Sequence, residues 1–268
     1  MKRVGVLIPI RLTSERLPSK AMKHICGRPV VYHLLDRACA SKYVTDPRQV
    51  VVCTTQDSSD DPLVAAVESY GASVFRGSRD DIIKRFSDAM EHFDFDAVMQ
   101  ADGDDPLTDT FYMDLTMDRL LSDETLGIVI GSGLPLGTAS KSFSREAMRK
   151  VLQHYRSDHN DTGFIYFFTK TGLCKMDTVQ AIGPQHVHNE IRLTLDYEQD
   201  LELFTRIFEA LYEPGRVFGL AEVVELARKQ PELLKINGNL DEEYWERTRE
   251  KAKLQYQDTQ GHVISIPV

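Results

Sequence analysis

Basic and hydroxyl side chains gather in one short loop near the N-terminus, directly after a predicted strand. Residues 4–10 form an unbroken apolar run of the kind that a parallel sheet buries on both faces. The following stretch, RLTSERLPSK, carries positive charges on Arg11, Arg16 and Lys20, with the hydroxyl of Ser14 between them. Because open α/β sheets bind ligands beyond the carboxyl ends of their strands, this loop predicts anion binding. A solvated loop with scattered charges is the alternative.

Acidic side chains follow two further predicted strands. Asp102, Asp104 and Asp105 come after one of them, and Asp196 comes after another. Since the strand ends of a parallel sheet meet at one edge, we expect Asp104 and Asp196 to lie close together although they are far apart in sequence. Mg²⁺ prefers one or two carboxylates together with phosphate oxygens and water, so this pair predicts a magnesium site facing the basic loop. An acidic turn for the first group and a helix N-cap for Asp196 are the alternatives.

A glycine-containing turn follows a third predicted strand and precedes a helix. In FRGSRDD (residues 75–81), Gly77 permits close backbone approach, and Ser78 can cap the helix or offer its amide to a ligand. Helix capping alone explains Ser78, and only the position at the same sheet edge favours a binding role. Neither a P-loop nor a GxGxxG motif occurs in the sequence, so a bound nucleotide must be held by other means.

Predicted strands and helices alternate along most of the chain. Strands are expected at residues 4–10, 49–54, 72–75, 96–100, 127–130 and 191–195, and helices at 30–41, 60–70, 80–93, 110–121, 145–155, 198–211 and 220–229. This rhythm implies βαβ crossovers and therefore an α/β fold with a mostly parallel sheet flanked by helices. It degrades over residues 133–190, in which 175–190 are expected to form strand and loop. We interpret this section as an excursion from the sheet that covers the site or forms a subunit contact. The tail from Asp241 is expected to be helical to about Gln257.

Composition narrows the class of protein. The 268 residues carry a net charge of −9 with a pI of about 5.4, and they show no basic stripe of the kind that binds nucleic acid. No apolar stretch approaches the roughly 18 residues of a membrane span. The four cysteines lack CxxC spacing, and a reducing cytoplasm is the expected compartment. We therefore expect neither nucleic acid nor a membrane as partner.

Several of these segments together resemble one family. The pattern Arg11-x-x-Ser14-x-Arg16-Leu17-Pro18-x-Lys20, followed by Ile25-x-Gly27-Arg28-Pro29, resembles the opening signature of the sugar cytidylyltransferases. That group includes the CMP-Kdo synthetases, the acylneuraminate cytidylyltransferases and the spore-coat polysaccharide protein F-like enzymes. The resemblance continues at residues 75–78, 103–107, 192–196, 200–202 and 231–237. It spans about residues 3–240 and leaves the tail outside.

The resemblance implies a Rossmann-like fold of the nucleotide-diphospho-sugar transferase type and a reaction dependent on CTP and Mg²⁺. The enzyme would transfer CMP to an acidic sugar or related phosphonate acceptor, release pyrophosphate, and act in surface polysaccharide or lipopolysaccharide biosynthesis. By position, the resemblance implies that the triphosphate is bound by Arg11, Ser14, Arg16 and Lys20, of which Arg11, Arg16 and Lys20 would be catalytic. The nucleotide would be contacted by Arg76, Ser78 and Asp102, and Mg²⁺ by Asp104 and Asp196.

The resemblance also divides the chain. It implies a nucleotidyltransferase domain over residues 1–240, in which about 133–190 serve as lid, dimer contact and acceptor site, and a helical C-terminal extension over 241–268. A cytoplasmic homodimer is expected. Residues 133–190 match the family poorly, so the acceptor stays open. Asp105 also departs from the glutamate or cysteine that is common there, and YEQD at 197–200 departs from the usual TPED.

Other functions remain open from the sequence. One is a nucleotidyltransferase that uses another nucleotide, such as GTP with a sugar phosphate. A second is a metal-dependent glycosyltransferase, which would also hold a metal–nucleotide on acidic residues but would not need the loop at 11–20. A third is a non-catalytic relative, against which the intact Arg11, Lys20, Asp104 and Asp196 argue.

Overall fold

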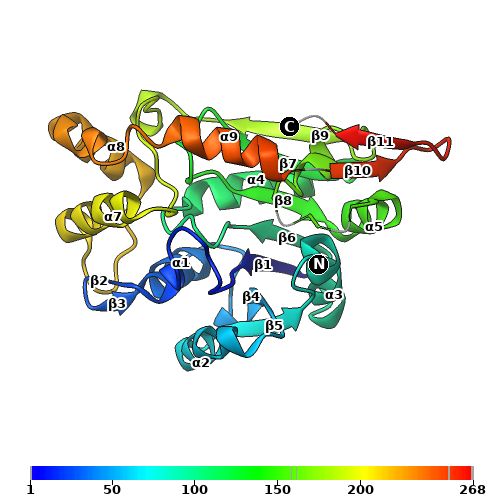
Figure 1. Cartoon of the computed structure of the whole chain (residues 1–268), viewed down its shortest axis with the longest axis horizontal. Coiled ribbons are helices and arrows are strands. Elements are labelled where there is room, and N and C mark those ends of the chain that lie inside the picture. The colour runs from blue at the N-terminus through cyan, green and yellow to red at the C-terminus, as the bar shows by residue number, and fades with distance from the viewer. Residues whose placement is uncertain (1, 158, 161, 253, 267–268) are drawn as a thin grey trace.

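A seven-stranded sheet organises the computed structural model, which describes residues 2–157, 159–160, 162–252 and 254–266 (Figure 1). Its strands are β1 (Val4–Pro9), β4 (Val50–Thr55), β5 (Ser73–Gly77), β6 (Ala97–Gln100), β7 (Ile128–Ser132), β8 (Lys141–Ser144) and β9 (Met176–Gln180). They lie in the order β5-β4-β1-β6-β8-β7-β9, and β8 runs antiparallel to both neighbours while all other pairs are parallel. The predicted α/β fold with a mostly parallel mixed sheet is confirmed.

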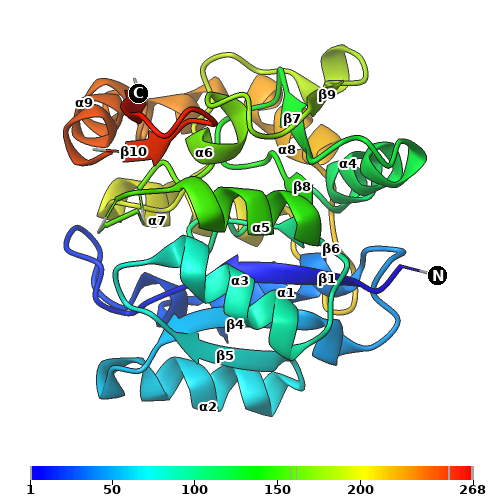
Figure 2. The same ribbon diagram turned by 90° about the vertical axis from the view of Figure 1, so that its right-hand side faces the viewer.

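Helices cover both faces of this sheet. They are α1 (Val30–Cys39), α2 (Asp61–Tyr70), α3 (Ile82–His92), α4 (Thr110–Ser122), α5 (Arg145–His154), α6 (Tyr166–Thr169), α7 (Glu198–Leu211), α8 (Leu220–Lys229) and α9 (Asp241–Lys251). In Figure 2, α3 and α5 lie side by side in front of the sheet. None of the helices within the described residues combines the length and the apolar composition needed to span a lipid bilayer.

The first strand shows why the sheet is buried on both faces. Successive side chains of a strand point to opposite sides. Val6 and Ile8 pack on the side covered by α1, α2 and α4, whereas Leu7 packs on the side of α3 and α5. All three side chains are fully buried. This two-sided burial explains the unbroken apolar run in the sequence and places the basic loop at the carboxyl edge of the sheet.

A third apolar cluster lies at that edge and packs against the basic loop between β1 and α1. It is built mainly by α7 and α8, and Leu17 from the middle of the basic loop is fully buried in it together with Leu193 and Leu195. Burying a leucine side chain contributes roughly 1.5–3 kcal/mol. The loop between β1 and α1 is therefore fixed at its centre, and its charged side chains need little reordering before they bind a ligand.

The strand expected at residues 191–195 is absent, which corrects the prediction. The segment is extended but forms a single bridge, between Arg192 and Leu136. Its amides bind loop carbonyls instead, since Leu193 N donates to Leu136 O at 2.9 Å and Leu195 N to Asp104 O at 2.7 Å. The segment therefore lies against two loops and is not a member of the sheet.

The middle section is part of the main sheet rather than a separate excursion. Residues 133–190 contribute β8, α5, α6 and β9. The strand predicted within residues 175–190 is present as β9 but belongs to the main sheet, and β8 was not predicted. A short serine-rich strand such as KSFS carries little apolar periodicity, although Phe143 is fully buried. The lid and dimer roles of this section, and a boundary at residue 240, stay predictions.

The C-terminal extension is only partly helical. The predicted helix to about Gln257 is wrong beyond Lys251, where α9 ends and an antiparallel hairpin of β10 (Leu254–Gln257) and β11 (Val263–Ile266) follows. Leu254 and Ile266 face each other and are both buried against the core. Figure 1 shows the hairpin beside α5, consistent with the bridge between Tyr155 and Tyr256. The β-branched residues of VISI explain why a strand forms there.

Candidate active site

The side chain of Lys20 joins the two acidic groups. Its Nζ lies 3.1 Å from Asp104 Oδ2 and 2.9 Å from Asp196 Oδ1. Only 14% of the Lys20 side chain is exposed. Asp104 follows β6 and Asp196 follows the extended segment 191–195, so the predicted meeting of these distant carboxylates beside the basic loop is confirmed.

Asp196 is surrounded by positive charge. Besides Lys20, it pairs with Arg16 Nη2 at 2.6 Å and with Arg192 Nη2 at 3.3 Å. Arg192 is itself buried and also pairs with Asp200 at 3.3 Å. Burial alone would raise the pKa of Asp196, but the charges of Lys20 and Arg16 outweigh it and hold the pKa below its ordinary value.

Asp104 has a different electrostatic environment. Burial raises the pKa of Asp104, and the single nearby ammonium of Lys20 does not compensate, because Asp196 and Asp102 add negative charge close by. Burial by itself would lower the pKa of Lys20, but the carboxylates of Asp104 and Asp196 outweigh it and raise the pKa. Asp196 is therefore firmly ionised, whereas Asp104 is the carboxylate that most needs a further cation.

A close backbone contact fixes the acidic turn. Gly103 packs against the end of β1, so that a Cβ on it would lie 2.3 Å from Pro9 O and 2.4 Å from Ile10 Cγ1. The amide of Leu195 binds the carbonyl of Asp104 on the other side of the turn. Asp104 is therefore positioned by its backbone at two points.

We expect Gly103→Ala to lower both stability and turnover. The added methyl group would push the turn away from Pro9, at a cost of about 1–3 kcal/mol in the free energy of unfolding, as for other overpacked sites. Urea unfolding and steady-state kinetics measure the two effects. Gly219→Ala is the control, since the nearest atom to its added Cβ lies 3.8 Å away. Wild-type stability in Gly103→Ala would contradict this account of the turn.

A buried aspartate anchors the start of the basic loop. Asp60 is 1% exposed and accepts hydrogen bonds from Leu12 N at 2.7 Å, Thr54 Oγ1 at 2.8 Å and Thr55 Oγ1 at 2.6 Å. Burial by itself would raise the pKa of Asp60, but the bonds from Leu12 and Thr55 outweigh it and lower the pKa. The carboxylate thereby ties the loop to the end of β4.

We expect Asp60→Asn to lower the free energy of unfolding by about 2–3 kcal/mol at neutral pH. The new NH2 group can only donate, but it would face N–H and O–H groups that also donate. An acid whose pKa is lowered by folding stabilises the protein above its unfolded pKa of about 3.9 and loses this contribution as the pH falls through the folded value. The difference in the free energy of unfolding between Asp60→Asn and wild type should therefore stay constant between about pH 8 and 5 and shrink below about pH 4. Urea unfolding across this range tests it, with the neighbouring exposed Asp61→Asn as control. A difference independent of pH throughout would refute the assignment.

A cavity of about 580 Å³ opens above these groups. Its lining includes seven of the residues predicted from the sequence, namely Arg11, Ser14, Arg16, Lys20, Asp102, Asp104 and Asp196. Further walls come from residues 134–137, from 162–166 and from α9. The loop, the acidic turn and the middle section thus converge on one volume at the carboxyl edge of the sheet.

Besides the basic residues of α9, two basic residues of this cavity were not predicted from the sequence. Lys141 begins β8 and binds Asp102 Oδ2 at 2.5 Å, and Arg85 projects from α3. The signal for Arg85 was its place on the apolar side of an amphipathic helix, between Ile82 and Phe86, which are buried. Lys141 gave no such signal because its strand was not recognised.

Arg76 and Ser78 are not brought into the cavity lining within the described part of the chain. The Arg76 guanidinium binds Thr55 O at 2.8 Å and Asp61 at 2.6 Å. Ser78 accepts a bond from Asp81 N at 3.2 Å, and Asp81, rather than Ser78, is the N-cap of α3. Their contact with a nucleotide stays a prediction.

Asp196 is likewise not the N-cap of the following helix. Tyr197 occupies that position, and Asp200 accepts from the amides of Asp196 at 2.8 Å and Tyr197 at 2.9 Å. The side chain of Asp196 is therefore left to the site. The alternative prediction, that Asp196 caps the following helix, is therefore wrong.

The donor set fits a hard divalent cation in part. Asp104 and Asp196 offer carboxylate oxygens around a point that already stabilises the positive charge of Lys20. Among the described residues, no three histidine, cysteine, aspartate or glutamate side chains group closely enough to hold a metal alone. A Mg²⁺ ion at this place would accordingly take its other ligands from phosphate and water, as this ion commonly does.

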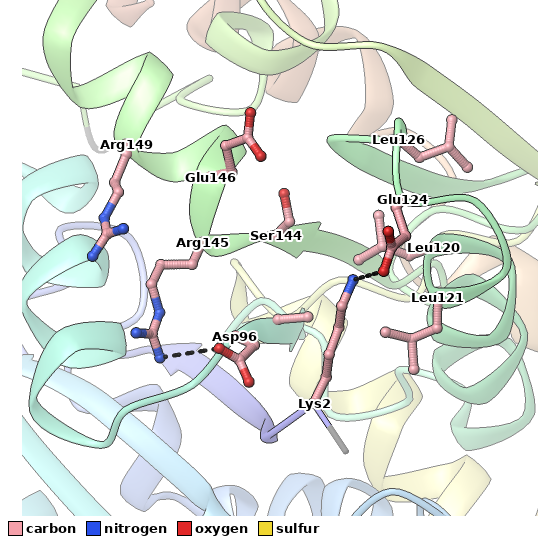
Figure 3. Close-up of a pocket in the computed structure, with 11 residues that line it drawn as sticks. Lys2, Asp96, Leu120, Leu121, Glu124, Leu126, Ser144, Arg145, Glu146 and Arg149 are labelled. Carbon is pink, nitrogen blue, oxygen red and sulfur yellow. Dashed lines mark ion pairs between the residues drawn. The ribbon is translucent and has the colours of Figure 1, made fainter.

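A second cavity of about 480 Å³ lies at the opposite edge, where β1 and β6 begin. Figure 3 shows Arg145 paired with Asp96 and Lys2 paired with Glu124 around it. These pairs are 3.7 and 3.8 Å long, and both acids are substantially exposed. No converging carboxylates or basic loop accompany them among the residues of this lining, so the chemistry belongs to the other edge.

Comparison with known proteins identifies a family for this chain. A family model described as cytidylyltransferase matches residues 5–217. The spore coat polysaccharide biosynthesis protein SpsF of Bacillus subtilis is 23% identical over 236 residues, which cover 87% of this chain and 97% of that protein. The 3-deoxy-manno-octulosonate cytidylyltransferase of Yersinia pseudotuberculosis is 29% identical over 151 residues, covering 54% and 56% of the two chains.

A solved cytidylyltransferase from Leptospira borgpetersenii has the same fold. It superposes with a TM-score of 0.78 at 24% identity and covers 87% of this chain and 97% of its own. The family match includes the basic loop, the acidic turn and Asp196. The chain therefore belongs to the cytidylyltransferase family and is a nucleotidyltransferase enzyme.

Proposed function

We propose that the protein is a Mg²⁺-dependent cytidylyltransferase that transfers CMP from CTP to an anionic sugar or related acceptor and releases pyrophosphate. The observation that carries the proposal is the placement of Lys20 between Asp104 and Asp196, with Arg16 on Asp196, beneath a cavity at the carboxyl edge of the sheet. The cytidylyltransferase match and the relative that acts on 3-deoxy-manno-octulosonate support CTP and an acidic sugar.

The chain supplies groups suited to each part of this reaction. Nucleotidyl transfer needs positioning and charge neutralisation more than covalent chemistry from the protein. Arg11, Arg16 and Lys20 would bind the triphosphate and stabilise the negative charge that develops on the departing pyrophosphate. Asp104 and Asp196 would hold Mg²⁺, which neutralises phosphate oxygens when bound. Close packing at Gly103 and burial of Leu17 fix the positions of the acidic turn and the basic loop.

Pyrophosphate release tests the proposal. The purified protein is assayed with CTP, ATP, GTP and UTP against keto-acid sugars, sugar phosphates and phosphonates, with Mg²⁺ and with EDTA. We expect turnover with CTP and at least one anionic acceptor, and its loss in EDTA. Turnover with GTP and a sugar phosphate alone, or no release with CTP and any acceptor, would refute it.

The place of the enzyme in surface-polysaccharide biosynthesis forms part of the same proposal and is supported by the named role of SpsF. The homodimer that the resemblance implies is tested by the mass of the protein in solution. A monomeric mass at assay concentration would reject the dimer and leave the catalytic proposal intact.

A further inference from the structure

Helix α9 forms one wall of the cavity although it lies beyond the matched family region. Tyr244, Trp245, Arg247, Thr248 and Lys251 of this helix all line the cavity. Within this fully described helix no side chain is buried, and the buried anchors are Leu240 before it and Ala252 after it. The side chains of α9 itself therefore contribute nothing to the core, and several of them border the cavity instead.

One end of α9 is held by the residues around Asp196. Asp241 pairs with Arg192 at 3.4 Å, and Glu243 accepts a hydrogen bond from the hydroxyl of Tyr197 at 3.0 Å. The ring of Tyr244 lies 4.5 Å from the Arg192 guanidinium. Through these contacts, the helix is attached to the buried arginine that supports Asp196.

The other end of α9 reaches the basic loop. Arg247 and Lys251 both pair with Glu15, the latter at 3.2 Å. These two cations lower the pKa of Glu15, which is therefore ionised at neutral pH. One carboxylate balances only one of the two cations, so a positive charge is left over at the mouth of the cavity.

An aromatic face accompanies this charge. Trp245 is 42% exposed and lines the cavity beside Tyr244, whose ring centroid lies 5.2 Å away. An exposed indole offers an apolar surface for the C–H face of a sugar ring, and a guanidinium binds a carboxylate or a phosphate with paired hydrogen bonds. The two together suit an acidic sugar.

The position of α9 favours the acceptor over the nucleotide base, on the prediction that Arg76 and Ser78 mark the nucleotide side. The predicted nucleotide residues Arg76 and Ser78 stand at β5, one edge of the sheet. Figures 1 and 2 both show α9 far from β5, toward the half of the molecule that contains β7. Its C-terminal end also meets the 162–166 wall, since a Cβ on Gly163 would lie 3.2 Å from Ala252.

We propose that Trp245, Arg247 and Lys251 form the binding surface for the acceptor, with the indole against the sugar ring and the two cations on its carboxylate or phosphate. This inference rests on the proposed function, which it extends by assigning acceptor recognition to the C-terminal helix.

Tryptophan fluorescence can test the surface directly, because Trp245 is the only tryptophan in the sequence. The full chain with Mg²⁺ and CTP is titrated with 3-deoxy-manno-octulosonate, a hexose 1-phosphate and a neutral hexose. We expect one anionic probe to change the emission and the neutral hexose to leave it unchanged. The responding probe distinguishes a carboxylate from a phosphate acceptor. No change with either anion would overturn the inference.

Arg247→Gln supplies the specific variant, and Arg249→Gln is its matched control on the same helix but outside the cavity lining. We expect Arg247→Gln to weaken the fluorescence response and raise the acceptor KM about tenfold, the effect of losing one charge-assisted hydrogen bond. The KM for CTP should not change. Equal behaviour of the two variants, or a rise in the CTP KM alone, would overturn the inference while the proposed function stands. If wild type turns over no acceptor, the proposed function fails, and the titrations still decide this surface.

Discussion

Lys20→Ala is expected to lower turnover by about 10²–10³-fold, the usual effect of removing one preorganised group that stabilises developing negative charge. Lys20 is the only residue within the described chain whose side chain pairs with both Asp104 and Asp196. It is also largely buried, which makes its charge effective on a bound phosphate. Steady-state pyrophosphate release with CTP measures the loss. Turnover close to wild type would show that the site is misassigned.

A matched control lies three positions further along the chain. Lys23 pairs with the exposed Glu198 at 3.2 Å and does not line the cavity. Lys23→Ala removes the same charge from the same segment and should leave turnover near wild type, as most surface substitutions do. Equal losses in both variants would mean that the general positive field, rather than the placed ammonium, supports the reaction.

The stability of Lys20→Ala offers a readout without turnover. Without the ammonium, Asp104 loses its ion-pair partner among the described residues, while Asp196 keeps Arg16 and Arg192. The two carboxylates are then open to another cation. Since a ligand that binds only the folded state raises stability, we expect Mg²⁺ to raise the Tm of this variant more than that of wild type. Equal Tm shifts in the variant and in wild type would argue against a metal bound by Asp104 and Asp196.

Much of the fold was predictable because apolar patterns follow local geometry. The buried strand at the N-terminus is marked by an unbroken apolar run, and the helices at 198–211 and 220–229 by apolar residues at helical spacing. β8 escaped prediction because a four-residue strand with serines has almost no period to detect. The hairpin after Lys251 was not predicted because LQYQ has no clear strand pattern of its own, and its pairing with VISI and contact with the core depend on tertiary placement.

The candidate site was predictable to the extent that it depends on strand ends. The proximity of Asp104 and Asp196 was predicted from that rule, although Asp196 follows a segment outside the sheet rather than a strand. Arg85, Lys141 and the residues of α9 reach the cavity from a helix, an unrecognised strand and the tail. Their contribution depends on tertiary placement, which no local pattern encodes.

Asp196→Asn and Asp104→Asn should separate stability from metal dependence, because the two carboxylates differ in burial and in partners. Asp196 is 2% exposed and pairs with three cations, whereas the Asp104 side chain is 34% exposed and pairs with Lys20. We expect both variants to need more Mg²⁺ for half-maximal turnover. Titration of Mg²⁺ at saturating CTP measures this. An unchanged Mg²⁺ requirement in either variant would exclude that carboxylate as a ligand.

The free energies of unfolding should diverge. Asp196→Asn leaves the buried Arg192 with one carboxylate fewer, and breaking a buried pair from one side costs about 3–5 kcal/mol. We expect the lower end, since Arg192 keeps Asp200 and Asp241. Asp104→Asn should change stability by no more than about 1 kcal/mol, because partly exposed pairs are screened by solvent and Lys20 keeps Asp196.

The pH dependence of the two variants gives the sharpest distinction. Folding lowers the pKa of Asp196, so its contribution is complete above the unfolded value of about 3.9 and disappears as the pH falls through the folded value. Folding raises the pKa of Asp104, so ionising it costs stability as the pH rises above the unfolded value toward the folded one. The deficit of Asp196→Asn should therefore persist from about pH 8 to 5 and shrink below about pH 4, whereas Asp104→Asn should gain on wild type as the pH rises from about 4. Urea unfolding across this range measures both curves, and parallel curves would show that Lys20, Arg16 and Arg192 do not distinguish the two carboxylates.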